Sequence, residues 1–132
     1  MSTITIDNAL YNEAEMYAKD KDSVLKEIDE LIKLKANWDG YGAIPILEGS
    51  IHNAKSIVLD ESINVSNIED VQPNPNGTVS IVWSNGMNQV CLEIGTEKMS
   101  FFADINGKTS YSKIEKITNE NTLKLAAYVN QL

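Results

Sequence analysis

The chain has 132 residues, of which 42% are hydrophobic and 23% charged, a composition that fits one ordinary folded domain and argues against wholesale disorder. Nineteen acidic against eleven basic side chains give a formal net charge of −8, which repels nucleic-acid phosphates and suits docking onto a basic partner. A single cysteine, Cys91, excludes an internal disulfide. No signal peptide is visible and no apolar run reaches the ~18 residues that span a bilayer, so we expect a cytoplasmic protein without a membrane partner.

The first element expected is a strand followed by a helix. Threonine and isoleucine alternate over residues 2–7, the period of a short strand, with Thr3 and Thr5 on one side. A helix is expected from Ala9 to about Lys19. The charged run after it closes an N-terminal element covering residues 1–22, a possible dimerisation element.

This element resembles the opening of ribbon-helix-helix transcription factors, which include many bacterial antitoxins. The matching residues run from Thr3 to Tyr11, followed by Ala14 and Ala18. In that family two strands pair across a dimer and place alternate side chains in the DNA major groove, which here would be Thr3 and Thr5. The second half of that family's pattern is missing, and the strand has no Arg or Lys to neutralise phosphates. The competing interpretation is a strand that edges the protein's own sheet, or pairs across a homodimer without DNA.

The main domain is expected over residues 23–132, opening with a helix capped by Ser23. Its apolar residues recur at helical spacing and form one stripe: Val24, Leu25, Ile28, Leu31 and Ile32. A second helix is predicted over Leu47–Leu59, with Ile51, Ala54, Ile57 and Val58 facing inward. His52 in this helix lacks a second ligand at four residues' distance, so a surface position is expected.

A corner, Asn37–Ala43, separates these two helices. Gly40 and Gly42 permit a sharp turn, and Asp39 can accept a hydrogen bond from the backbone two residues on. Trp38 and Tyr41 are expected to anchor the turn to the core. The corner is therefore either a structural turn or a recognition loop, whose candidate partner-binding residues are Trp38, Asp39, Gly40, Tyr41 and Gly42.

Residues 60–70 are expected to form a polar loop, and residues 72–77, with two prolines and Asn-Gly, a turn. Strands follow, and their apolar residues alternate on one face: Val79, Ile81, Trp83, Val90, Leu92, Ile94, Met99, Phe101, Ala103 and Ile105. With a short polar fourth strand from Thr109 to about Ile114 at the edge, they predict an antiparallel four-stranded meander packed against two or three helices, an α+β fold.

The last turn leaves two registers to choose between. A two-residue loop at residues 106–107 would set Ala103 opposite Ser110 and leave Tyr111 outside. A three-residue loop at residues 106–108 would set Ala103 opposite Tyr111 and keep the apolar face continuous, and we favour it. A terminal helix is expected from about Asn119 to Asn130. Its apolar side is predicted to comprise Leu123, Ala126, Ala127 and Val129.

From about Leu25 onward the chain also resembles a family of small, poorly characterised bacterial proteins. The residues that carry this likeness are Asn37–Ala43, Pro45, Ala54, Pro73–Thr78 and Ile81–Trp83. The resemblance implies a fold rather than a reaction. It also implies a setting beside toxin, phage-defence or mobile-element genes, and hence neutralisation of a partner.

These observations favour a non-enzymatic protein-binding module, antitoxin-like or immunity-like, that neutralises a basic toxin or defence enzyme. The alternatives are a dimeric DNA-binding autoregulator that uses Thr3 and Thr5, and a phage-encoded inhibitor of a bacterial defence enzyme. An enzyme is not expected, because Asp39, Glu93 and Asp104 are merely acids near apolar elements. No phosphate loop or metal-spaced cluster appears, so no cofactor or metal is expected.

Overall fold

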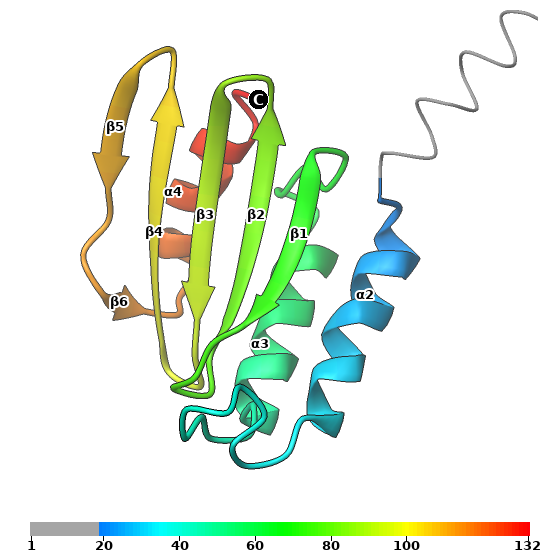
Figure 1. Cartoon of the computed structure of the whole chain (residues 1–132). Coiled ribbons are helices and arrows are strands. Elements are labelled where there is room, and N and C mark those ends of the chain that lie inside the picture. Colours follow the sequence, from blue (N-terminus) through cyan, green and yellow to red (C-terminus); the bar gives the residue numbers. More distant parts are fainter. Residues whose placement is uncertain (1–18) are drawn as a thin grey trace, which may run out of the picture.

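The computed structural model of the chain describes residues 19–132, in which three helices lie against one face of an antiparallel sheet (Figure 1). The N-terminal strand and helix expected before residue 19, including Thr3 and Thr5, lie outside the described residues. The elements are α2 (Lys21–Glu30), a 3₁₀ turn (Leu31–Lys33), α3 (Glu48–Leu59), β1 (Ile68–Pro73), β2 (Val79–Asn85), β3 (Asn88–Ile94), β4 (Lys98–Ile105), β5 (Lys108–Tyr111), β6 (Glu115–Lys116) and α4 (Asn119–Val129).

The sheet confirms the predicted α+β fold. Its strands follow the order β1-β2-β3-β4-β5, all antiparallel, and β6 pairs with the start of β4. The four strands expected from the sequence are β2 to β5, and their apolar residues face the helices as predicted. Those on the three central strands are almost all fully buried: Val79, Ile81, Trp83, Val90, Leu92 and Ile94, with Met99 and Ala103 close behind.

Helix α3 confirms its predicted inward face. Ile51, Ala54, Ile57 and Val58 are buried in the shared core, and His52 is exposed. Lys55 reaches Asp29 of α2 at 2.9 Å and ties the two helices together at the surface. Within residues 19–132, no helix combines the length and the apolar character needed to cross a membrane.

The predicted loop over residues 60–70 is confirmed for residues 60–67, but its last three residues begin strand β1. Its polar residues suggested a loop, but on this edge strand they point away from the helices. Only the side of β1 that faces the helices needs to be apolar. On that side Ile68 pairs with Trp83 and Val71 pairs with Ile81. The turn to β2 is correspondingly shorter than residues 72–77, because β1 runs to Pro73.

Helix α2 begins earlier than predicted. Asp20, not Ser23, is its N-cap, and the Asp20 carboxylate accepts a hydrogen bond from the Ser23 N–H at 2.7 Å. Lys21 and Asp22, from the charged run expected to close the N-terminal element, are therefore the first residues of the helix. At the other end the chain tightens into a 3₁₀ turn, and Ile32 leaves the apolar stripe and is 50% exposed.

The favoured register of the last hairpin was wrong. Ala103 pairs with Ser110 and Phe102 with Tyr111, across a two-residue turn. Asn106 and Gly107 both have positive φ, 53° and 79°, which is the type I′ conformation that matches strand twist. Turn chemistry decided this register because β5 is an edge strand with little core to cover, and Tyr111 is left 77% exposed.

The terminal helix exists as predicted, but its inward face is rotated. Thr118 caps it by accepting a hydrogen bond from the Asn121 N–H. The buried side chains are spaced at i, i+3, i+4 and i+7: Thr122, Leu125, Ala126 and Val129. Leu123 and Ala127, expected inside, are exposed. The hydroxyl of Thr122 donates to the Thr118 carbonyl, so this polar group is buried without loss of hydrogen bonding.

Candidate functional site

The corner Asn37–Ala43 is held by hydrogen bonds from its own residues. The Asp39 carboxylate accepts from the N–H groups of Tyr41 and Ala43 at 2.8 and 3.0 Å. The Asn37 side chain accepts from the Gly42 N–H at 2.8 Å. Asn37, Gly40 and Gly42 all have positive φ, between 65° and 87°. Because its side chains satisfy its backbone, the loop has one defined shape.

The two aromatic residues of the corner behave differently. Trp38 is half-buried, packs against the core, and donates its indole N–H to the Ile44 carbonyl at 2.9 Å. This confirms its predicted anchoring role. Tyr41, which was also expected to anchor the turn, instead stands 93% exposed between the two left-handed glycines. The corner thus presents an aromatic side chain on a rigid backbone.

A second turn lies directly against the corner. The Ile44 N–H donates to the Pro75 carbonyl at 3.0 Å, and the Leu47 N–H donates to the Gly77 carbonyl at 3.1 Å. A Cβ on Gly77 would lie 3.0 Å from the side chains of both Ile44 and Leu47. The fold therefore brings together the two stretches that carried the second sequence resemblance, residues 37–45 and 73–78.

The turn between β3 and β4 completes this end of the molecule. Asn53 of α3 donates to the carbonyls of Gly95 and Thr96 at 2.9 and 3.0 Å. Gly49 allows the close approach, since a Cβ there would lie 2.8 Å from the Thr96 methyl group. Its cost to the helix, ~1 kcal/mol relative to alanine, is offset by this packing. We call the region formed by residues 37–49, 74–78 and 95–97 the corner end; it lies at the bottom of Figure 1.

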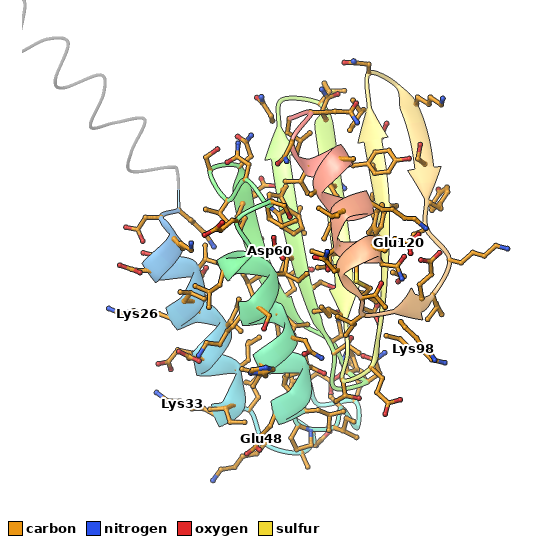
Figure 2. The ribbon with its side chains drawn as sticks, turned by 180° about the vertical axis from the view of Figure 1, so that it is seen from behind. Lys26, Lys33, Glu48, Asp60, Lys98 and Glu120 are labelled. Carbon is orange, nitrogen blue, oxygen red and sulfur yellow. The ribbon has the colours of Figure 1, made fainter. Side chains whose placement is uncertain are left out.

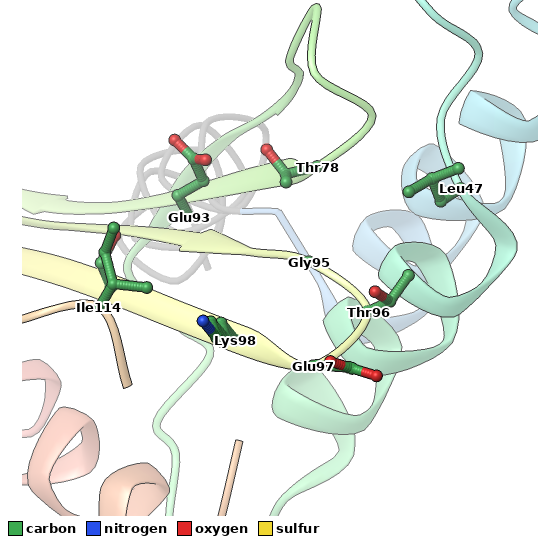
Figure 3. A pocket seen from close by; sticks show the side chains of 9 residues that line it. Leu47, Thr78, Glu93, Gly95, Thr96, Glu97, Lys98 and Ile114 are labelled. Atoms are coloured by element: carbon green, nitrogen blue, oxygen red, sulfur yellow. The ribbon is translucent and has the colours of Figure 1, made fainter. Parts of the chain in front are cut away.

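A hollow of about 280 Å³ opens at the corner end, on the side of the sheet away from the helices (Figure 3). Leu47 and Ile114 contribute apolar groups, while Thr78, Glu93 and Lys98 contribute polar ones. Asn76 donates to the Glu93 carboxylate at 3.2 Å, so the second turn and the hollow are linked. Such a mixed, open hollow suits the side chain of a partner better than it suits an enclosed small molecule.

The acids considered as catalytic candidates are not brought together. Glu93 lines the hollow, and the Asp39 carboxylate accepts hydrogen bonds from the backbone of the corner. Asp104 lies toward the other end of the sheet, where it pairs with Gln89 and Thr109. Among residues 19–132, no group of three or more His, Cys, Asp or Glu side chains is arranged to hold a metal ion. Asp39, Glu93 and Asp104 are therefore not placed to act as a pair.

Cys91 lies on the uncovered face of the sheet, in register with Val82 and Phe102. Partial burial raises the pKa of its thiol, and the neighbouring Glu93 carboxylate raises it further. Both effects keep the sulfur protonated near neutral pH. An ordinary thiol, rather than a nucleophile, fits this environment.

Comparison with protein-family models, with curated proteins and with solved structures finds no match to this chain. The candidate site consequently depends on geometry alone. Sequence reasoning identified Asn37–Ala43 but missed the contribution of Ile44, Leu47 and the hollow. Ile44 and Leu47 lie in the linker around Pro45, whose pairing with residues 74–78 is not encoded by any local pattern.

Proposed function

We propose that this chain is a non-enzymatic protein-binding module, antitoxin-like or immunity-like, that uses the corner end to bind a basic protein. The observation that carries the proposal is the exposure of Tyr41 on a loop whose backbone is fixed by Asp39 and Asn37. A side chain held in this way loses little conformational freedom on binding, and tyrosine is enriched among residues that dominate binding energy.

Three more exposed apolar residues belong to the corner end. Ile44 and Leu47 are 44% and 42% exposed, and Pro75 next to them is exposed as well. We call Tyr41, Ile44, Leu47 and Pro75 the corner surface. Apolar side chains at the centre with polar residues around them are the usual arrangement of a protein interface.

Glutamates lie at and beside the corner end, while Lys33 and Lys35 lie in the chain just before the corner. Glu48, Glu93 and Glu97 are exposed here, and Lys98 is the cation that lines the hollow beside them (Figures 2 and 3). The chain as a whole carries a formal charge of −8. The overall charge favours encounter with a basic partner and opposes encounter with nucleic acid.

The test is co-expression with the product of each neighbouring gene, scored by relief of growth arrest and then by the dissociation constant of the purified pair. We expect Tyr41→Ala to weaken binding by about tenfold to a hundredfold, as loss of a central tyrosine does. The matched control is Met87→Ala, because Met87 is 95% exposed in the turn between β2 and β3, at the other end of the sheet.

The binding of the two variants can either support or contradict the proposal. Binding that falls with Tyr41→Ala and stays unchanged with Met87→Ala supports the corner surface as the contact. Failure of every neighbouring gene product to bind, or equal binding by both variants, contradicts the proposal. A phage-encoded inhibitor of a defence enzyme would give the same pattern with that enzyme as partner.

A further inference from the structure

The face of the sheet that the helices leave uncovered carries a row of apolar side chains. Each of four neighbouring strands contributes one residue, and each residue is in register with the next: Val82, Cys91, Phe102 and Tyr111. We call these four residues the apolar row. In Figure 1 this face is turned toward the viewer, with α3 and α4 behind the sheet. The open face of an antiparallel sheet is ordinarily polar, so a contiguous apolar row on it indicates a contact surface.

The apolar row is accessible to a partner. Tyr111 is 77% exposed, and Val82, Cys91 and Phe102 are partly exposed. The Phe102 and Tyr111 rings pack together, with their centroids 6.3 Å apart. A hollow of about 220 Å³ lies beside the row; Cys91, Phe102 and Tyr111 contribute to its lining, as do Glu93 and three serines. Glu93 also lines the hollow at the corner end, so the two hollows adjoin on this face.

Acidic side chains flank the apolar row on both sides. Glu93 on β3 lies two residues from the row on one side, and Asp104 on β4 lies two residues from it on the other, about 7 Å in each case. Within residues 19–132, neither carboxylate forms a salt bridge. The cations lie farther out: Lys98 is four residues from the row along β4, about 13 Å away, and Lys19 and Lys113 lie near its two ends.

An α-helix matches the size of this surface. The apolar row crosses three strand spacings, about 14 Å, and roughly ten helical residues span that length at a rise of about 1.5 Å each. Apolar residues at every third or fourth position of such a helix form one stripe along it. Glu93 and Asp104 are about 14 Å apart across the row, slightly more than the roughly 10–12 Å diameter of a helix. A cationic side chain on each flank of the helix therefore reaches one of the two carboxylates.

We propose that the uncovered face binds an amphipathic helix of the basic partner. The apolar stripe of that helix lies on the apolar row, and lysine or arginine side chains on its two flanks pair with Glu93 and Asp104. This inference rests on the proposed function for the basic character of the partner, and it adds the segment that the partner contributes. An apolar side chain from the stripe fills the hollow beside Cys91 and Phe102.

Charge favours this occupant over the other candidates. A second copy of the chain, which also carries a formal charge of −8, would bring its own acidic face against Glu93 and Asp104. Residues 1–18 contain three acidic side chains and no lysine or arginine, so they offer these two carboxylates no cation to pair with. Like charges placed opposite one another oppose binding, whereas a basic helix is attracted.

The test is titration of a fluorescently labelled peptide with the full chain, followed by fluorescence anisotropy. The probe is a synthetic amphipathic peptide of about 14 residues, with leucines along one stripe of the helix and lysines on both flanks. Two control peptides keep its length. One carries glutamates in place of the lysines, and the other has its leucines dispersed around the helix. We expect the lysine peptide to bind at least about tenfold more tightly than either control.

A first variant tests the apolar row. Phe102→Ser should weaken binding of the lysine peptide by about tenfold or more, because it removes an aromatic side chain from the row. The matched control is Leu123→Ser, which removes an apolar side chain that is 51% exposed on α4, on the covered side of the sheet. Urea midpoints of both variants show that the fold is retained.

A second variant tests the flanking charges. Glu93→Gln combined with Asp104→Asn should weaken binding by roughly threefold to tenfold at low salt and by less at high salt, because salt screens exposed charges. Glu61→Gln combined with Glu120→Gln removes the same charge after α3 and at the start of α4, and it should leave binding unchanged (Figure 2).

Three results would overturn the inference. One is equal weakening by the two pairs of acid substitutions, which would reduce binding to attraction by the net charge. Another is unchanged binding after Phe102→Ser. The third is absence of binding by the unmodified chain, as expected when a second copy or another segment of the chain covers the face.

The proposed function can fail separately from this inference. If the lysine peptide binds through Phe102 while no neighbouring gene product binds, only the proposed function is contradicted. If a gene product binds through Tyr41 while the lysine peptide does not bind, only the helix-binding face is contradicted.

Discussion

The two ends of the sheet use the same dipeptide for different purposes. Asn-Gly occurs at residues 76–77 at the corner end, and at residues 85–86 and 106–107 at the other, which we call the hairpin end. All three glycines have positive φ, between 62° and 85°. Among residues 19–132, nothing lies within 4 Å of a Cβ on Gly86 or Gly107, whereas one on Gly77 would lie 3.0 Å from two side chains.

The glycines at the two ends of the sheet therefore have different structural roles. At the hairpin end glycine only reverses the chain, so those turns are local structures. At the corner end the glycine also admits Ile44 and Leu47, and with them the whole segment that presents Tyr41. The exposed apolar surface therefore occurs where distant segments are locked together, as a binding site on a rigid scaffold requires.

The largest effect is expected from Gly77→Ala. Alanine there combines an unfavourable left-handed φ with overpacking against Ile44 and Leu47, so we expect a loss of about 2–4 kcal/mol in the free energy of unfolding. Urea denaturation followed by tryptophan fluorescence measures it. Gly86→Ala, with the backbone strain but no crowding, should lose only about 1–2 kcal/mol. Equal losses would mean that the corner end is no more tightly assembled than the hairpin end.

A smaller effect is expected from Asp39. Asp39→Ala leaves the N–H groups of Tyr41 and Ala43 without an acceptor, at a cost of about 1–3 kcal/mol. Asp39→Asn retains a carbonyl oxygen and should lose about 1 kcal/mol or less. Urea midpoints of the two variants test this order. An Asp39→Ala variant as stable as the unmodified chain would show that the corner holds its shape by other means.

The smallest effect concerns acid, and it lies away from the corner end, at the close of α3. The Ser62 hydroxyl and then the Ser62 N–H hold the pKa of Asp60 below its ordinary value near 3.8. A carboxyl whose pKa is lowered by folding stabilises the protein fully at pH values above its ordinary, unfolded pKa. This stabilisation is lost as the pH falls through the lower pKa of the folded state.

We therefore expect Ser62→Ala to flatten the loss of stability below about pH 4 and to leave the pH dependence unaltered above pH 5. The change should stay below about 1 kcal/mol, because the pair is partly exposed to solvent. Urea midpoints between pH 2 and 6 provide the measurement. A steeper acid dependence after Ser62→Ala would contradict the assignment.

Local patterns predicted most of the elements, and they failed where a choice depended on distant residues. Ile51, Ala54 and Ile57 followed helical spacing closely enough to be placed correctly. Tyr111 was misplaced because continuity of the apolar face was weighed above turn chemistry, and β5 has too little core beside it for continuity to matter. β1 was missed because an edge strand with one buried side has nearly the composition of a loop.

The sequence by itself determined the α+β class, the apolar face of the meander, the inward side of α3 and the sharp corner at Asn37–Ala43. Each of these follows from a period or from a backbone preference of neighbouring residues. Only the tertiary structure decided that Tyr41, unlike Trp38, stays in solvent, and that Ile44 and Leu47 pair with residues 75–77. Those outcomes depend on contacts between segments some thirty residues apart, which no local spacing encodes.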